Sequence, residues 1–147
     1  MAEIILSNRM QALTDMVTPG TVITDVGCDH GFVSVYLVQK GISPRVIAMD
    51  VRSGPLEHAR EHIREYGLED RIETRLSDGL HSLKTGEAAG MICAGMGGPL
   101  MEKILTEGRE QAKGFRELIL QPQSEIPHFR TFLMEEGLSL IHISEPT

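Results

Sequence analysis

Apolar segments and amphipathic segments alternate along this 147-residue chain. Short apolar segments bounded by turn residues predict strands over residues 22–26, 45–51, 71–76 and 88–96, with the core of a fifth strand at 118–120. Continuous apolar runs are typical of parallel strands that are buried on both faces. The alternation therefore predicts one α/β domain with a doubly wound, mostly parallel sheet and helices on both faces.

Apolar residues at helical spacing predict helices between these strands, over residues 6–17, 29–40, 53–66, 99–114 and 125–136. We expect Ser7 and Ser124 to be N-caps, because a hydroxyl accepts a hydrogen bond from a free amide of the first turn. Gly41, Gly67 and Gly137 are the expected helix ends. Residues 138–143 form a candidate sixth strand.

Residues 22–32, V-I-T-D-V-G-C-D-H-G-F, form a strand, turn and helix start, the ligand-binding end of a doubly wound sheet. A dinucleotide site needs G-x-G-x-x-G, so that the backbone can approach a pyrophosphate. This turn has only Gly27 and Gly31, and it carries Asp25 and Asp29. Carboxylates repel phosphate but attract the ammonium and sulfonium groups of S-adenosylmethionine (SAM). We therefore favour SAM; the simpler alternative is a tight turn with Asp29 as helix cap.

Two further acids follow predicted strands. Asp50 lies 19 residues beyond Gly31, near the spacing at which α/β cofactor sites place an acid on the ribose hydroxyls. Asp78, followed by Gly79, suits the exocyclic amino group of an adenine, which donates to a carboxylate. A plain Asp-Gly turn explains the second pair equally well.

The fourth strand runs into a glycine-rich turn, A-G-M-G-G-P at 94–99. Glycines there allow a ligand or a substrate ring to approach the backbone closely. Methyltransferases that act on exocyclic nitrogens often carry an Asp/Asn-Pro-Pro-aromatic loop at this place, and this chain has none. The acceptor atom is therefore expected to have a free lone pair.

The chain is acidic, with 14 Lys and Arg against 21 Asp and Glu and a net charge of −7. This balance argues against a general coat of nucleic acid but leaves room for a local basic face. The arginines of residues 52–75 alternate with acids, which is typical of a solvated helix face. His58 and His62, four residues apart, lack a third ligand, so we predict no metal site.

Two cysteines, Cys28 and Cys93, indicate free thiols in a reduced, cytoplasmic protein, although both are expected at neighbouring strand ends where an oxidised pair is conceivable. The first residues do not form a signal peptide, and no apolar run approaches the roughly 18 residues of a membrane span.

Several motifs together resemble one family: L-S-N-R-M at 6–10, D-V-G-C-D-H-G-F at 25–32, the acid at 50 with S-G-P at 53–55, D-G at 78–79, A-G-M-G-G at 94–98 and L-I-L-Q-P-Q at 118–123. This is the TrmK family, bacterial SAM-dependent enzymes that methylate N1 of adenine twenty-two in tRNA. The resemblance covers residues 1–137 and implies a Rossmann-like class I methyltransferase domain in the cytoplasm.

The resemblance also implies roles for individual residues. It assigns to cofactor binding Asp25, Gly27, Cys28, Asp29, Asp50, Asp78, Gly79, Ala94, Gly95 and Met96. Arg9, Gly97, Gln121 and Pro122 are assigned to the substrate, although Arg9 alone reads equally as a solvated residue. Cys28, Asp50 and Gly31 depart from the serine, glutamate and alanine usual in the family, and the shorter Asp50 weakens the expected ribose contact.

N1 of adenine is unprotonated at neutral pH, so no strong base is needed and the enzyme's task is alignment. N1 lies on the Watson–Crick edge, so the base must be unpaired or flipped out. Asp29 is the candidate to stabilise the developing charge and His30 to position the base; the alternative for Asp29 is pure cofactor binding. Rival functions are a small-molecule SAM methyltransferase, a SAM-binding but inactive fragment and, third, a nicotinamide dehydrogenase.

The family continues through a last strand pair and a C-terminal helical domain, and we expect this chain to be truncated before them. Residues 138–147 are expected to be a truncated tail, with residues from about 139 not native. In this fold the seventh strand lies between the fifth and the sixth. We therefore expect the tail to be disordered or to pair irregularly, with the last strand pair of the sheet incomplete.

Overall fold

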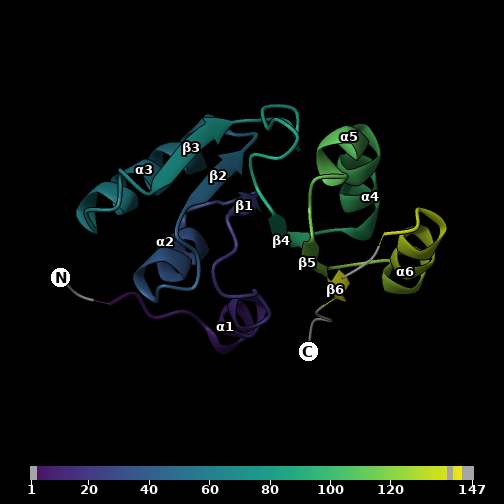
Figure 1. Ribbon diagram of the computed structural model, residues 1–147, viewed down its shortest axis with the longest axis horizontal. Helices are drawn as coiled ribbons and strands as arrows, with labels where there is room; N and C mark the ends of the chain where they lie inside the picture. Colours follow the sequence, from purple (N-terminus) through teal and green to yellow (C-terminus); the bar gives the residue numbers. More distant parts are fainter. Residues whose placement is uncertain (1–2, 139–140, 144–147) are drawn as a thin grey trace.

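A six-stranded parallel sheet forms the centre of the computed structural model, which describes residues 3–138 and the backbone of residues 141–143 (Figure 1). The strands are β1 (Ile23–Val26), β2 (Val46–Asp50), β3 (Ile72–Leu76), β4 (Gly90–Met96), β5 (Glu117–Pro122) and β6 (Ile141–Ile143). Their order is β3-β2-β1-β4-β5-β6, and every pairing is parallel. The winding reverses between β1 and β4, which confirms the predicted doubly wound fold.

Helices cover both faces of the sheet, as predicted. Helices α1 (Asn8–Asp15), α2 (Phe32–Gln39) and α3 (Ser53–Glu65) pack on one face. Helices α4 (Gly98–Glu107), α5 (Arg109–Ala112) and α6 (Ile126–Glu135) pack on the other. Within the described residues, no helix combines the length and apolar character that a membrane span requires.

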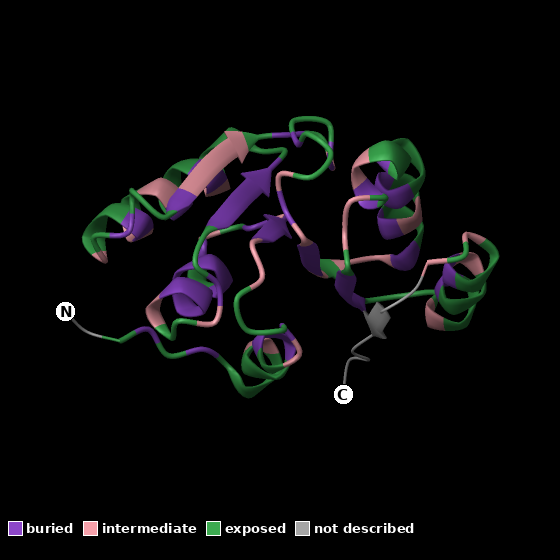
Figure 2. Cartoon of the chain, in the orientation of Figure 1, coloured by how far each residue is buried: buried purple, intermediate pink, exposed green. Residues whose placement is uncertain are grey.

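Alternation along the central strands divides the core into two layers, and Figure 2 shows β1 and β2 coloured as buried. Successive strand residues point to opposite faces. In β2, Val46 and Ala48 join the cluster under α1–α3, whereas Ile47 and Met49 join the cluster under α4–α6. All four are buried, because both faces of this strand are covered. The sequence run therefore appears wholly apolar rather than alternating.

Of three predicted helix starts, one is confirmed and two need correction. Ser7 does cap α1, since its side chain accepts a hydrogen bond from the Met10 amide. Ser124, however, caps nothing: α6 follows Glu125, which has a left-handed φ of 55° and makes no capping bond. Helix α2 begins at Phe32 rather than near residue 29. Asp29 has a left-handed φ of 53° and lies in the turn before the helix, and Gly31 holds the N-cap position.

The segment predicted as one helix over 99–114 is divided at Gly108 into α4 and α5. A Cβ atom at Gly108 would lie 2.6 Å from Leu80 Cδ1 and 2.9 Å from the Ile104 carbonyl oxygen. Because Gly108 has no side chain, the loop that contains Leu80 packs closely against the helix backbone where the two helices meet.

The tail was expected to be disordered or to pair irregularly; its described strand lies directly beside β5, in the place where the fold puts its seventh strand, and within the described residues the last strand pair is incomplete. Residues 141–143 pair regularly with β5, in the register Leu118 to Ile141, Ile119 to His142 and Leu120 to Ile143. A strand at the edge of a sheet presents unpaired backbone groups, so β5 itself provides the partner that we expected to be missing. Residues 139–140 and 144–147 lie outside the described residues.

The two-layer core predicts which substitutions unfold the protein. Phe129 of α6 is fully buried under β4 and β5, so Phe129→Ala is expected to lower the free energy of unfolding by about 3–5 kcal/mol in urea denaturation. Met134, on the same helix and 81% exposed, provides the control, with a change for Met134→Ala below about 0.5 kcal/mol. Equal losses in both variants would contradict this packing.

Candidate functional site

A cavity of about 610 Å³ lies at the carboxyl ends of β1, β2 and β4, at the point where the winding reverses. Ligands of open α/β sheets bind at such a switch point. The lining includes the predicted residues Arg9, Asp25, Gly27, Cys28, Asp29, His30, Asp50, Asp78, Gly79, Ala94, Gly95, Met96 and Gln121. The structure thus brings together residues that span more than a hundred positions of the sequence.

The turn after β1 forms one wall of the cavity. The amides of Gly27 and Cys28 both donate to the Met49 carbonyl oxygen, at 2.8 and 2.9 Å, so the turn is tied to β2. Gly27 has a φ of +74°, and a Cβ atom there would lie 2.5 Å from the end of the Met96 side chain. Gly27 therefore permits both the bend and the close approach of the β4 turn.

Asp50, at the end of β2, is held by backbone donors. Its Oδ2 accepts from the Asp29 amide and its Oδ1 from the Arg52 amide, each at 3.0 Å. The side chain is only 4% exposed, yet it lines the cavity. Each carboxylate oxygen has a second lone pair. Asp50 can therefore keep both backbone bonds and accept hydrogen bonds from the two hydroxyls of a cis-diol.

Asp25 is the most perturbed acid of the site. Burial raises the pKa of its carboxyl to about 6. The hydrogen bond that Ser34 Oγ donates to Asp25 at 2.8 Å acts in the opposite direction and lowers this pKa, but its effect is smaller than that of burial. The negative charges of Asp50 and Asp29 add to the rise. A cation placed in the cavity would favour the charged form of Asp25, so this carboxyl and a cationic ligand stabilise each other.

Asp29 and His30 lie beyond the turn, and both are accessible. Asp29 Oδ1 lies 3.8 Å from His30 Nε2, and the two side chains are 62% and 43% exposed. The centroids of the His30 and His58 rings lie 5.1 Å apart. The backbone carbonyl oxygen of His30 lies 2.8 Å from His62 Nδ1. The two histidines that the sequence offered as a weak metal pair therefore support the His30 segment.

Both thiols are buried and free. Burial raises the pKa of Cys93 to about 12, and it raises that of Cys28 as well, with the neighbouring acids adding to both shifts. Thiols in this state are poor nucleophiles. Cys28 and Cys93 therefore shape the cavity wall and the core beneath it rather than react.

Two predicted substrate residues do not line the cavity. A Cβ atom at Gly97 would lie 2.8 Å from Ser124 Oγ, and one at Gly98 would lie 2.5 Å from the Ser124 carbonyl oxygen. These glycines therefore let the β5–α6 loop pack against the β4 turn. Pro122 pairs with Met96 in the sheet. In this structure the two glycines make room for protein, and the assignment of Gly97 and Pro122 to the substrate stays a prediction.

The sequence reasoning missed the apolar part of the lining. Phe32, Val51 and Leu100 line the cavity although they are 43%, 58% and 46% exposed. Large apolar side chains at that exposure outside a core are typical of a surface that a ligand covers. The signal was present in Val51, an apolar residue directly after the strand-end acid. Phe32 and Leu100 lie within predicted helices, where an apolar residue by itself gives no such signal.

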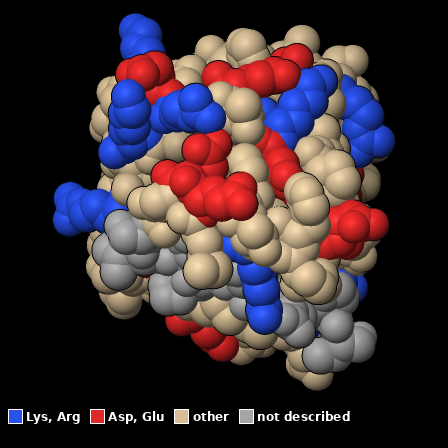
Figure 3. Space-filling model, turned by 90° about the vertical axis from the view of Figure 1, so that its right-hand side faces the viewer, with Lys and Arg blue, Asp and Glu red and all other residues tan. Residues whose placement is uncertain are grey.

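Negative charge dominates the cavity lining. Asp25, Asp29, Asp50 and Asp78 face only two cations, Arg9 and Arg52, among the lining residues. Arg9 is engaged by Gln123, whose Oε1 accepts from its Nη2 at 3.2 Å. Elsewhere the charges mix: in the face shown in Figure 3, acidic and basic side chains are interspersed. The cavity thus favours a cationic or zwitterionic ligand over a diphosphate.

Asp78 also belongs to an exposed group with His81 and Glu107, whose ligand atoms lie within 4.8 Å of one another. Such groups are common on protein surfaces without an ion. Nothing else at this place points to a metal.

Comparison with known proteins agrees with the geometry. The family model described as a methyltransferase domain matches residues 6–144. The tRNA (adenine(22)-N(1))-methyltransferase of Bacillus subtilis is 36% identical over 141 residues, which are 96% of this chain and 59% of that protein. The chain therefore spans about three-fifths of the length of this relative.

Solved structures give the same answer. The crystal structure of the B. subtilis m1A22 tRNA methyltransferase TrmK superposes with a TM-score of 0.84 at 34% identity, over 91% of this chain and 57% of that one. The structure of Mycoplasma capricolum TrmK with S-adenosyl-homocysteine superposes with a TM-score of 0.81 at 26% identity, over 88% and 57%. The resemblance drawn from the motifs is confirmed over this domain: the chain belongs to the family described as a methyltransferase domain, and within that domain it is similar to TrmK.

Proposed function

We propose that the cavity binds SAM. The carboxylates around the β1 turn suit its ammonium and sulfonium groups, and Asp50 retains lone pairs for a ribose diol. The volume of about 610 Å³ falls within the range of cofactor pockets. Asp78 and Gly79 lie where an adenine would meet the loop after β3. The M. capricolum relative, solved with S-adenosyl-homocysteine, supports the same assignment.

We further propose that the substrate is tRNA and that the methylated atom is N1 of adenine 22. The observation that carries this proposal is a carboxylate-lined cavity in a chain whose relatives are named for that reaction. The absence of an Asp/Asn-Pro-Pro-aromatic loop after β4 agrees with an acceptor that needs no proton removed. The buried free thiols support the cytoplasm as its location.

Asp29 and His30 are the proposed catalytic residues. When bound, SAM supplies an electrophilic methyl group. Because methylation leaves the adenine cationic, the accessible carboxylate of Asp29 stabilises the charge that develops on the ring. His30, 3.8 Å from Asp29 and supported by His62, positions the base. Arg9 and Gln121 remain the proposed substrate contacts, while Gly97 and Pro122 shape the loops around them.

A small-molecule methyltransferase is the second candidate, and the acidic net charge of −7 favours it. The deciding experiment offers the protein SAM with bulk tRNA, with tRNA in which adenine 22 is replaced by guanine, and with metabolite pools. We expect methyl transfer to the unmodified tRNA alone, mapped to adenine 22. Transfer to a metabolite, or equal transfer to the substituted tRNA, would reject the proposed substrate.

Removal of the Asp29 carboxylate tests the catalytic role. Asp29→Ala is expected to lower the rate of methyl transfer at least about a hundredfold, because one preorganised electrostatic partner contributes on that order. Its backbone amide, which donates to Asp50, is retained, so SAM affinity measured by calorimetry should fall much less. Normal SAM binding with normal transfer would contradict the catalytic assignment; equal loss of both would reduce Asp29 to cofactor binding.

The raised pKa of Asp25 predicts how SAM binding depends on pH. With a pKa of about 6, Asp25 is charged at pH 7.5 and mostly protonated at pH 5. If the charged form binds the cation, affinity should fall about tenfold between these values. Asp25→Asn should bind weakly and lose the dependence.

The imidazole of His30 lies in the same cavity, so the titration is repeated in His30→Gln. A pH dependence that survives in Asp25→Asn but disappears in His30→Gln would contradict the assignment to Asp25.

A further inference from the structure

The loop between β3 and β4 reaches the cavity without a helix or strand of its own. Residues 77–89 consist of turns and bends, and Ser77, Asp78 and Gly79 line the cavity. Within residues 3–138, no donor forms a hydrogen bond with the Asp78 carboxylate. The position of this carboxylate therefore depends on how the loop backbone is held.

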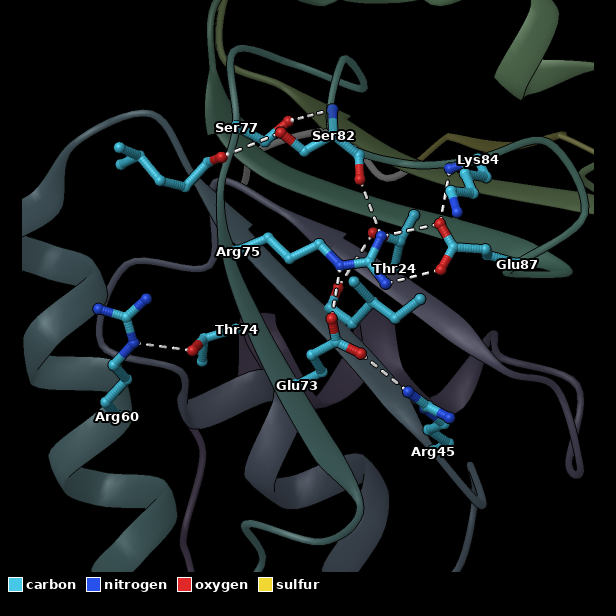
Figure 4. Close-up of polar contacts among 12 residues, drawn as sticks. Thr24, Arg45, Arg60, Glu73, Thr74, Arg75, Ser77, Ser82, Lys84 and Glu87 are labelled. Carbon is cyan, nitrogen blue, oxygen red and sulfur yellow. Dashed lines mark hydrogen bonds and ion pairs between the residues drawn. The ribbon is translucent and has the colours of Figure 1, made fainter.

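Arg75, on β3, holds the far part of this loop with its whole guanidinium group (Figure 4). Its Nη1 donates to the Ser82 carbonyl oxygen at 2.8 Å. Nη1 and Nη2 donate to the two oxygens of Glu87 at 2.8 and 2.6 Å, and Nε donates to Glu73 at 2.7 Å. A planar fork with two parallel bonds fixes its partner in orientation as well as in distance.

Serine hydrogen bonds carry this anchor to Asp78. The Ser82 amide donates to Ser77 Oγ at 3.0 Å, and Ser77 Oγ donates to the Gly79 carbonyl oxygen at 2.8 Å. Ser82 Oγ donates to the Leu76 carbonyl oxygen at 3.0 Å. Asp78 lies between Ser77 and Gly79. Ser82, which Arg75 contacts, is therefore hydrogen-bonded directly to Ser77 at one end of the turn that presents Asp78, and through Ser77 Oγ to Gly79 at the other end.

The site of Arg75 is sheltered, which makes these bonds effective. Its side chain is 19% exposed and that of Glu87 is 27% exposed. The hydrogen bonds from Arg75 are the largest cause that lowers the pKa of Glu87 to about 2, and the Lys84 amide adds to it. Without Arg75, a half-buried Glu87 carboxylate would lose its partner, and the turn over residues 84–87 would move toward water.

We infer that Arg75 is a positioning residue that sets Asp78 against the exocyclic amino group of the cofactor's adenine. This inference rests on the proposed binding of SAM. It has a consequence for selectivity, because an amino group donates to a carboxylate whereas a carbonyl oxygen in its place is repelled. A firmly held Asp78 rejects the 6-oxo form of the cofactor, and a loosely held one does not.

Calorimetry with two ligands measures this selectivity. S-adenosylhomocysteine is compared with S-inosylhomocysteine, in which a carbonyl oxygen replaces the 6-amino group. The unsubstituted protein is expected to prefer the adenine compound about tenfold or more. In Arg75→Met the preference should fall to about threefold or less, with the affinity for the inosine compound nearly unchanged. Arg45→Met is the matched control. Arg45 also donates to Glu73, which lies on β3 with Arg75, but Arg45 does not contact the loop.

Each outcome decides the inference. Equal weakening of both ligands in Arg75→Met would reduce Arg75 to a structural residue and overturn it, as would a retained preference. If circular dichroism shows that Arg75→Met is unfolded, Glu87→Gln replaces it, because this variant keeps one oxygen acceptor for Arg75. Glu87→Gln must then show the loss of preference for the adenine compound. If the unsubstituted protein binds neither compound, the proposed function is overturned together with this inference. If it binds them with the expected preference and the variant retains that preference, only the inference is overturned.

Discussion

The buried carboxylate of Asp50 is the interaction on which the site depends. A charge removed from water is tolerated only where hydrogen bonds replace its hydration. Here the two hydrogen bonds come from the backbone amides of Asp29 and Arg52, which lie in the turns that follow β1 and β2. One side chain at the end of β2 therefore fixes the turns after β1 and β2, the first of which lies at the switch point. The geometry of the cavity is a consequence of satisfying this one acid.

The same arrangement places negative charges close together. Asp25 lies near Asp50 and Asp29, and their repulsion adds to burial in raising the pKa of Asp25. The folded protein holds this crowding because the surrounding sheet is rigid and buried on both faces. Such local destabilisation is common in binding sites, where the ligand relieves it. A cationic ligand gains affinity from charges that the unliganded protein accommodates at a cost.

Local sequence patterns predicted the strands, the switch point and most acids of the site, because periodicity and strand-end position are properties of short segments. What they missed depends on distant residues. The start of α2 was misplaced because a left-handed Asp29 is fixed by its bond to Asp50, 21 positions away. Gly97 was assigned to the substrate because a glycine looks the same in sequence whether it makes room for a ligand or for Ser124.

The charge distribution separates the chemistry of the site from affinity for RNA. Phosphate contacts require clustered cations, and the cavity lining offers only Arg9 and Arg52, with Arg9 already engaged by Gln123. A chain with a net charge of −7 gains little from non-specific attraction to RNA. Under the proposed function, recognition within the cavity depends on the unpaired base and its ring edges, through the apolar walls of Phe32 and Leu100 and the carboxylate of Asp29. The proposed function therefore separates selectivity for the base from affinity for the polynucleotide, and it assigns only the first to the residues that line the cavity.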